Sequence, residues 1–244
     1  MTANSLERDD RSAGAPSPSQ TLSRGIQTLE ILAAADGPLT IAEIAAALAV
    51  HRSVAYRILR TLEDHSLLSR DGSGRFKLGA GLAVLARSVS RDLQAAALPE
   101  LTALANQLDM TAFVVIWDRH ECVTLTTVEP HHSRGAVVQR PGSRHPVDSG
   151  APGIAIQSAF DEAGWTDACP MVPYRLQAAK ARGLGYAESH DEVIAGVSSV
   201  AVPLALPEDK PAALAVVYVR SDQDPAAVGA ELAKRAERII EQML

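Results

Sequence analysis

The sequence has few cysteines and no long apolar run. Of its 244 residues only Cys122 and Cys169 are cysteine, and they are too far apart to form a Cys-x-x-Cys pair, so we expect reduced and mostly buried thiols. No apolar run approaches the ~20 residues that a membrane-spanning helix needs. The N-terminus also lacks the hydrophobic block of a signal peptide. These absences predict a cytoplasmic protein with no membrane partner.

The common motifs of catalysis are also missing. The chain has no Gly-x-Ser-x-Gly elbow, no P-loop and no Gly-x-Gly-x-x-Gly fingerprint. The carboxylate pairs Asp191-Glu192 and Glu208-Asp209 are adjacent in sequence, so their side chains point in different directions and are typical of solvated turns. We therefore expect neither an enzyme nor a bound cofactor.

A metal site is an alternative for the histidines. The candidate ligands are His120, Cys122, His131, His132, His145, Asp148 and His190. None of them has the compact spacing of known sites, such as Cys-x2-Cys or His-Glu-x-x-His. The spacing favours solvated or structural histidines, and we expect no metal.

Positive charge is scarce overall, but it is unevenly distributed. The net charge of −6 argues against a protein that coats nucleic acid indiscriminately. Residues 21–79 hold seven basic and six acidic side chains, whereas residues 80–244 hold 14 and 20. Residues 1–20 have no apolar periodicity and are predicted to be a disordered tail. A slightly basic N-terminal segment (21–79) followed by an acidic remainder (80–244) is typical of a small DNA-binding domain joined to a second domain.

Residues 50–64 sort into two faces when they are wound as a helix at about 100° per residue. The apolar face consists of Val54, Ala55, Ile58, Leu59 and Leu62. The opposite face consists of Arg52, Ser53, Tyr56, Arg57 and Arg60. Guanidinium groups suit guanine edges and phosphate oxygens, and hydroxyls can donate to either. Many surface helices carry three arginines, so the neighbouring segments must decide between a solvated face and a DNA-binding one.

Those neighbours predict a helix-turn-helix. A first helix is expected from Ser23 to the stop signal at residues 36–38. Thr40 and Glu43 form a capping box that opens a short second helix. About three residues separate that helix from Arg52, which is the tight turn of a helix-turn-helix.

A hairpin signal follows at once. Residues 67–70 and 75–78 are strand-like and flank Asp71-Gly72-Ser73-Gly74. A hairpin directly after a recognition helix is a wing, whose basic side chains would meet backbone phosphates. These side chains are Arg70, Arg75 and Lys77.

Residues 22–79 resemble the DNA-binding domain of the IclR family of bacterial transcription regulators. The matching stretches are residues 23–26, 29–32, 41–45, 52–62 and 76–79. The family usually has Lys-Ser-Thr at the start of the recognition helix, where this chain has Arg52-Ser53-Val54. The resemblance implies that Arg52, Ser53, Tyr56 and Arg57 read bases or adjacent phosphates, while Arg60, Arg70, Arg75 and Lys77 hold the DNA backbone.

The remainder predicts a mixed sheet with helices at its margins. Residues 80–95 are expected to form one amphipathic helix, and Pro99 suits the first turn of another through Leu108. Strands are expected at residues 112–117, 122–128, 135–139, 199–206 and 212–219, and helices at 150–160, 174–182 and 225–243. This order is typical of an α+β fold.

The second half resembles the IclR effector-binding domain, which is similar to GAF folds. The resemblance rests on residues 141–146, 151–153, 182–187 and 192–201. Together with the disordered tail predicted for residues 1–20, it implies three further parts. These are a winged helix-turn-helix DNA-binding domain (21–79), a linker helix that helps dimerisation (80–97) and a GAF-like mixed α/β effector-binding domain (98–244).

In this family the effector pocket lies between the sheet and the loop before the helix at residues 151–153. Carried over by position, the pocket residues are Val137, Ala151, Pro152, Ser189 and Ser199, with Val216 and Tyr218 on the last strand and Ser149 as a neighbour. A one-residue register error in that strand would exchange the inward side chains. Hydroxyls and helix-start amides suit a small carboxylate, and Arg134 is a candidate countercharge, although a loop arginine is often merely solvated.

We therefore interpret the chain as a sequence-specific DNA-binding transcriptional regulator, acting as a repressor. Its partners would be a palindromic double-stranded operator, a small effector such as an organic or aromatic acid, and further copies of itself in a homodimer or dimer of dimers. The alternative is a metabolite-binding or catalytic α+β protein whose small N-terminal domain contacts other proteins.

Overall fold

The computed structural model describes residues 19–131, 137, 139–206, 211–219 and 222–244. The chain divides into two compact units, Met1–Val89 and Ser90–Leu244. The tail expected at residues 1–20 lies outside the described residues except for Ser19 and Gln20, which begin the first helix.

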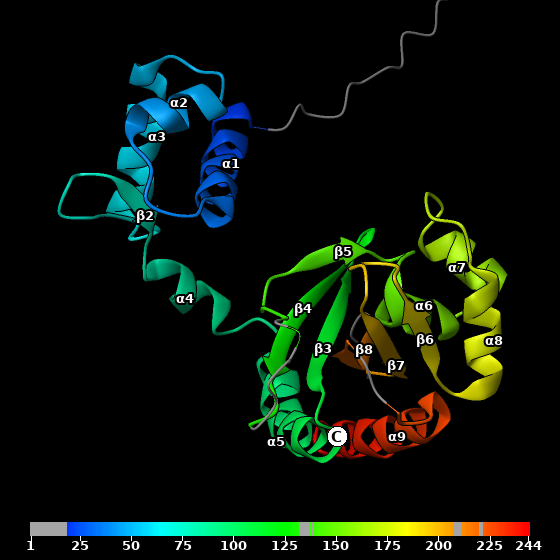
Figure 1. The fold of residues 1–244 in the computed structure, drawn as a ribbon. Coiled ribbons are helices and arrows are strands. Elements are labelled where there is room, and N and C mark those ends of the chain that lie inside the picture. The colour runs from blue at the N-terminus through cyan, green and yellow to red at the C-terminus, as the bar shows by residue number, and fades with distance from the viewer. Residues whose placement is uncertain (1–18, 132–136, 138, 207–210, 220–221) are drawn as a thin grey trace, which may run out of the picture. The chain divides into compact units, whose positions relative to one another are not determined.

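The first unit is a three-helix domain with a two-stranded wing (Figure 1). Its elements are α1 (Gln20–Ala34), α2 (Ile41–Ala47), α3 (Arg52–Asp64), β1 (Leu68–Arg70), β2 (Phe76–Leu78) and α4 (Gly81–Ala86). Strands β1 and β2 pair antiparallel. Seven buried side chains from α1–α3 and the wing form the core: Leu32, Ile44, Ile58, Leu59, Leu62, Leu68 and Phe76. The predicted winged helix-turn-helix is confirmed.

Local side-chain hydrogen bonds fix the ends of these elements. The capping box is present, since Thr40 N donates to Glu43 Oε2 at 2.7 Å and Glu43 N donates to Thr40 Oγ1 at 3.3 Å. In the wing, Asp71 Oδ1 accepts from the backbone N–H groups of Ser73 and Arg75. Helix α1 begins earlier than the sequence suggests, because Ser19 rather than Ser23 is its N-cap.

The single helix expected at residues 80–95 is instead two helices. Helix α4 ends at Ala86, and α5 (Arg91–Leu108) begins after Ser90, which has a left-handed φ of 45°. Pro99 lies inside α5 rather than in its first turn. Most of a helix's stability in a protein comes from packing an apolar face. No residue of α4 is buried, so such packing does not stabilise a longer helix here.

The second unit is built on one six-stranded sheet. Its strands are β3 (Thr111–Asp118), β4 (Glu121–Val128), β5 (Arg144–Pro146), β6 (Ala187–His190), β7 (Ser198–Leu204) and β8 (Ala212–Tyr218). They are ordered β5-β4-β3-β8-β7-β6, and every neighbouring pair is antiparallel. The short edge strands β5 and β6 were not predicted from the sequence, and the strand expected at residues 135–139 falls mostly outside the described residues.

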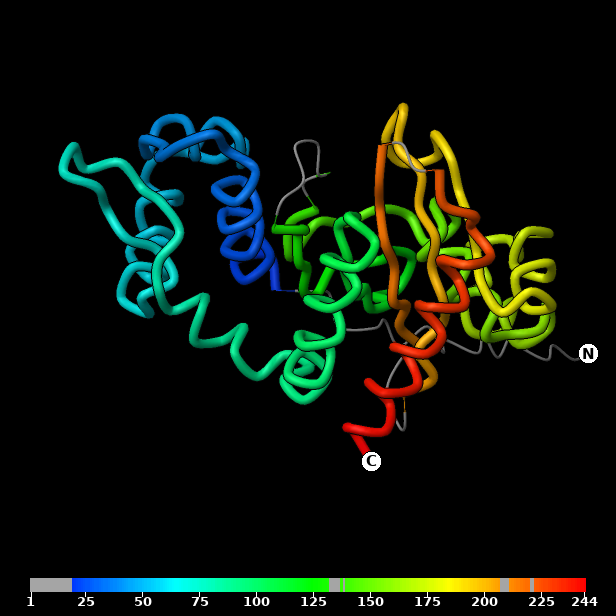
Figure 2. The backbone as a smooth tube through the Cα atoms, turned by 60° about the horizontal axis from the view of Figure 1, so that its bottom comes forward, coloured from blue at the N-terminus to red at the C-terminus, as the bar shows by residue number. Residues whose placement is uncertain are grey.

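Helices cover both faces of this sheet. Helices α5 and α9 (Pro225–Glu241) lie side by side on one face (Figures 1 and 2). The other face carries α6 (Gly150–Ser158), α7 (Glu162–Ala168) and α8 (Leu176–Leu184). Strand side chains alternate between the two cores, so that Val114 and Val216 pack towards α5 and α9 while Phe113 and Val217 pack towards α6. The predicted α+β class is confirmed.

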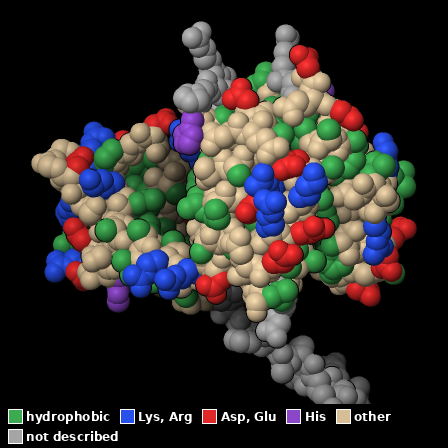
Figure 3. All heavy atoms as spheres, turned by 90° about the horizontal axis from the view of Figure 1, so that it is seen from below, with side chains coloured by type: hydrophobic (Ala, Val, Ile, Leu, Met, Phe, Trp, Pro, Cys, Tyr) green, Lys and Arg blue, Asp and Glu red, His purple; other side chains and the backbone are tan. Residues whose placement is uncertain are grey.

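An ion-pair network joins α5 to α9. Arg235 contacts Glu100 through Nη1 and Glu231 through Nε, each at 3.0 Å, and donates to Gln107 at 2.9 Å. Basic and acidic side chains lie next to one another on this face (Figure 3). The buried carboxylate of Glu100 is thus paired, which removes the cost of an isolated buried charge.

Two helical glycines predict opposite effects on stability. A Cβ on Gly153 in α6 would overlap the carbonyl oxygen of Val147, whereas one on Gly183 in α8 would meet nothing within 4 Å. We expect Gly153→Ala to destabilise the fold by about 1–3 kcal/mol or more through overpacking. Gly183→Ala should stabilise it by up to about 1 kcal/mol through helix propensity. Urea unfolding of both variants tests the packing, and a neutral Gly153→Ala would contradict it.

Candidate functional site

Helix α3 presents a polar face outward and an apolar face inward. Arg52, Ser53, Tyr56, Arg57 and Arg60 are all exposed, with Tyr56 at 47%. The buried side is Ala55, Ile58, Leu59 and Leu62. The two faces predicted for residues 50–64 are therefore present, with Val54 half-buried.

The start of α3 is capped by a histidine. Nδ1 of His51 accepts from the backbone N–H of Ser53 at 3.3 Å and lies 2.8 Å from its hydroxyl. This interaction fixes the first turn, which carries Arg52 and Ser53. A capping role for His51 is not predictable from the sequence pattern, because Ser, Thr, Asp and Asn are the usual N-cap residues.

The basic side chains differ in how far they are paired within the chain. Among the described residues, Arg52 and Arg57 have no ion pair. Arg60 Nε lies 3.8 Å from Asp64 Oδ1, and its pKa is raised first by a hydrogen bond with Tyr56 and then by Asp64. Arg52 and Arg57 are therefore open to an anionic partner, whereas Arg60 shares its charge with Asp64.

The wing arginines are more constrained. Arg70 donates from Nε and Nη2 to the two carboxylate oxygens of Glu63 at 2.9 and 3.0 Å, and its guanidinium lies 4.6 Å from the centre of the Phe76 ring. Arg75 Nη1 lies 3.4 Å from the carbonyl oxygen of Pro38. Lys77 is exposed on β2. Arg70 can reach a phosphate only by sharing or leaving Glu63.

A hollow lies between α3 and the wing. Its lining combines the capping-box end of α2, the polar face of α3 and the hairpin: Thr40, Ile41, Arg52, Tyr56, Arg70, Ser73, Gly74, Arg75 and Phe76. Cationic and hydroxyl groups thus surround a concave surface beside an exposed helix. This arrangement suits a nucleic-acid backbone that follows the helix into a groove.

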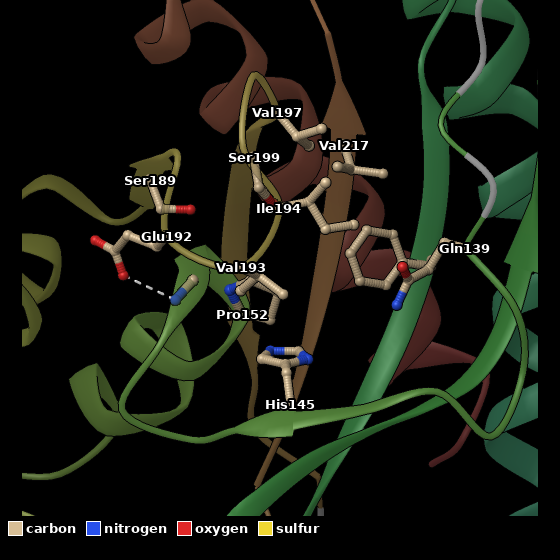
Figure 4. A pocket seen from close by; sticks show the side chains of 12 residues that line it. Gln139, His145, Pro152, Ser189, Glu192, Val193, Ile194, Val197, Ser199 and Val217 are labelled. Carbon is tan, nitrogen blue, oxygen red and sulfur yellow. Dashed lines mark hydrogen bonds between the residues drawn. The ribbon is translucent and has the colours of Figure 1, made fainter. Parts of the chain in front are cut away.

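The second unit contains a small cavity between the sheet, the start of α6 and the loop from β6 to β7 (Figure 4). Its volume is about 50 Å³. The lining residues are Phe113, Gln139, His145, Gly150, Pro152, Ser189, Glu192, Val193, Ile194, Val197, Ser199 and Val217. Because ligand pockets usually measure about 300–1,000 Å³, an organic ligand of that size requires the walls to move.

The predicted pocket residues divide into three groups. Pro152, Ser189 and Ser199 line the cavity. Ala151 and Val137 belong to or pack against the adjoining core, and Ser149 Oγ lies 3.4 Å from the carbonyl oxygen of Glu192. Arg134 lies outside the described residues.

The prediction for β8 is wrong by one residue. Val216 is buried in the core beneath α5 and α9, and Tyr218 packs against that same core. Val217 faces the cavity instead. Side chains alternate along a strand, so a shift of one position exchanges the two faces.

The amides at the start of α6 are already occupied by side chains of the β6–β7 region. Gly150 N donates to Glu192 Oε2 at 2.9 Å, and Ala151 N donates to Ser189 Oγ at 2.8 Å. Arg175 donates to both oxygens of Glu192 at 2.6 and 3.1 Å. This hydrogen-bonded pairing lowers the pKa of Glu192 and raises that of Arg175. Neither Glu192 nor Arg175 was predicted as a site residue.

His145 supplies the unsatisfied polar group of the cavity. Its side chain lines the cavity from β5, the residue is 8% exposed, and Nε2 has no hydrogen-bond partner. Other polar side chains there are satisfied, since Gln139 donates to Thr124 and Ser199 donates to the carbonyl oxygen of Val216. Buried polar groups normally have partners, so Nε2 is positioned for a ligand or a water molecule.

Other kinds of site find no support in the part of the chain that the structure describes. No group of three or more His, Cys, Asp or Glu side chains is placed to share a metal ion there. No helix of that part combines the length and apolarity that crossing a membrane requires. Cys122 and Cys169 are both buried free thiols.

Comparison with known proteins shows what the chain is similar to. A family model described as the IclR helix-turn-helix domain matches residues 21–72. An IclR transcriptional regulator from Alicyclobacillus acidocaldarius has a crystal structure that matches with a TM-score of 0.77 at 26% identity, over 92% of this chain and 98% of that one. The chain therefore contains an IclR helix-turn-helix domain and has the fold of an IclR transcriptional regulator.

Two further relatives extend the comparison. The transcriptional regulator Rv1719 of Mycobacterium tuberculosis is 32% identical over 155 residues, which span 63% of this chain and only 58% of that protein. An IclR homologue from Microbacterium hydrocarbonoxydans, crystallised with 4-hydroxybenzoate, has a TM-score of 0.78 at 22% identity, over 91% of this chain and 98% of that one. The family predicted from the sequence is confirmed. Its members are DNA-binding transcriptional regulators rather than enzymes.

The buried imidazole of His145 predicts a pH effect. Burial lowers the pKa of His145 from its ordinary value of 6.5, and Glu121 opposes this only in part. Between the two pKa values the unfolded chain binds more protons, so the free energy of unfolding should be highest above pH ~6.5 and fall as the pH drops below it, by at most about 1.4 kcal/mol per pH unit. Urea unfolding of wild type and His145→Asn between pH 7.5 and 5.5 measures this, and parallel pH profiles would refute it.

Proposed function

We propose that this chain is a repressor that binds a palindromic operator through α3 and the wing and is controlled by a small organic or aromatic acid in its second unit. The observation that carries the proposal is the outward face of α3, where Arg52 and Arg57 stay exposed and unpaired among the described residues. Such a face on a helix-turn-helix fits the major groove, where a guanidinium can donate two hydrogen bonds to guanine. A transcription regulator of this kind would act in the cytoplasm.

Specific roles follow from the exposure and pairing of each side chain. Arg52, Ser53, Tyr56 and Arg57 would contact bases or adjacent phosphates, since they lie on the first two turns of α3. Backbone contacts would come from Arg60, Arg70, Arg75 and Lys77. Of these, Lys77 and Arg60 need the least rearrangement, while Arg70 must first share its carboxylate partner.

Self-association is supported by α4. Its Val84 and Leu85 are 68% and 62% exposed, and the helix buries no residue in its own protomer. Exposed neighbouring aliphatic side chains favour a protein contact. A homodimer, or a dimer of dimers, would present two copies of α3 to the half-sites of a palindrome, about 34 Å apart.

Control by a ligand is supported by the cavity beside α6. It combines apolar walls with the unsatisfied Nε2 of His145 and a helix start, which are the features of a small-molecule site. The relative from Microbacterium hydrocarbonoxydans was crystallised with 4-hydroxybenzoate, and an acid of similar chemistry is our candidate class for this chain. Effector binding would change the relative placement of the two recognition helices.

Arg57→Ala tests the assignment of α3. Losing one base-contacting guanidinium should weaken binding to the DNA upstream of the gene by about 1–3 kcal/mol, roughly 5- to 150-fold, while ligand affinity is unchanged. Fluorescence anisotropy with labelled duplex measures the first quantity and calorimetry the second. Arg182→Ala, which removes an exposed arginine from α8, is the matched control. Equal losses of DNA affinity in both variants would contradict the assignment of α3. Loss of DNA binding and ligand binding together in Arg57→Ala would contradict the assignment of the two functions to separate units.

A further inference from the structure

The anion position at the start of α6 is filled by a carboxylate of the chain itself. Glu192 accepts from the amide of Gly150 at the helix N-terminus (Figure 4). It also accepts from two nitrogens of Arg175. A helix N-terminus combined with a bidentate guanidinium is the arrangement that binds a free carboxylate. Glu192 therefore occupies the place that a ligand acid would take.

The cationic half of this arrangement does not depend on Glu192. The fully buried Gln157 of α6 accepts from the backbone N–H of Arg175 at 2.9 Å and donates to the carbonyl oxygen of Val147 at 3.1 Å. Arg175 Nη1 also donates to the carbonyl oxygen of Asp148 at 2.8 Å. If Glu192 leaves, Arg175 stays beside the helix start as an unbalanced positive charge.

Glu192 also anchors the outer wall of the cavity. The next two residues, Val193 and Ile194, line the cavity although they are 51% and 47% exposed. Val193 lies so close to Gly150 that a Cβ there would be 2.9 Å from Val193 Cγ2. Gly150 has a positive φ of 78° as well, so glycine meets both constraints at this position. The wall is thus seated on the helix start through Glu192.

The size of the cavity and the pairing of Glu192 are therefore coupled. The cavity of about 50 Å³ is smaller than an organic acid needs, so binding one there would require Val193 and Ile194 to move outward. Because Glu192 directly precedes them, that movement would draw it away from Gly150 and Arg175. The vacated amide and guanidinium then require a new anion. A second observation also indicates a ligand, because the buried Nε2 of His145 has no partner and would lie 3.8 Å from a Cβ at Gly150.

We propose that Glu192 is an internal substitute for the effector's carboxylate, and that an apolar monocarboxylic acid binds by displacing it. The ligand carboxylate would take the Gly150 amide and Arg175, while its apolar part would fill the space among Phe113, Val197 and Val217. This proposal rests on the proposed function, which makes the cavity the effector site. A neutral amide cannot replace Glu192 as the counterion of Arg175, so the site selects acids.

Removing the internal competitor is the direct test. We expect full-length Glu192→Ala to bind benzoate at least tenfold more tightly than wild type does, and to gain thermal stability with benzoate or propionate in the millimolar range. Benzamide, the neutral probe, should gain no affinity. Titration calorimetry and thermal unfolding give both readouts. The matched control is Glu188→Ala, which removes an exposed carboxylate from β6.

The outcomes separate the proposal from its alternatives. If Glu192→Ala gained as much affinity for benzamide as for benzoate, the substitution would only have loosened the cavity wall, and the proposal would be overturned. The proposal would also be overturned if Glu192→Ala showed no saturable binding of a carboxylate. Should the alanine variant unfold, Glu192→Gln keeps one acceptor for Gly150 but loses the charge, and it must still favour benzoate over benzamide relative to wild type. Wild-type binding to the upstream DNA, measured alongside, tests the proposed function independently, because it does not depend on these probes.

Discussion

The apolar side of α3 is the constraint on which the first unit depends. Ala55, Ile58, Leu59 and Leu62 are buried against the other helices and the wing, at about 1.5–3 kcal/mol for each large aliphatic side chain. Because a helix has 3.6 residues per turn, burying these four positions leaves Arg52, Tyr56, Arg57 and Arg60 no place except solvent. The same packing that holds the domain together therefore sets the direction in which its cations point.

Pairing with intramolecular carboxylates distinguishes the arginines from one another. Glu63 holds Arg70 on the wing and Glu192 holds Arg175 beside α6, in each case through two hydrogen bonds. Arg52 and Arg57 have no such partner among the described residues. A paired arginine is kept in position but must exchange its carboxylate for an external anion. An unpaired one can bind a phosphate or base without that exchange, which is why we propose α3 for the DNA-binding role.

Sequence periodicity predicted the elements with strong local signals and missed those set by tertiary contacts. The two faces of α3 and the capping box at Thr40 and Glu43 were predictable because the residues that define them are close in sequence. The two faces of β8 were not predictable, because Ala212–Val217 is apolar throughout and has no alternation of polar and apolar residues that would distinguish them. The Glu192–Arg175 pair was not predictable either, because its partners lie 17 residues apart, one before α8 and the other in the loop between β6 and β7. Short strands such as β5 carry too few residues for a pattern.

The salt dependence of binding to duplex DNA tests the central claim most directly, namely that the outward cations of α3 and the wing bind the phosphate backbone and bases. Equilibrium titrations of the full chain with the duplex upstream of its gene would be run between 50 and 200 mM salt, beside a scrambled duplex of equal length. The account predicts tighter binding to the upstream sequence and a linear fall of log K with log salt, with a slope of about −0.9 per phosphate contact. Binding that ignores both salt and sequence would contradict it.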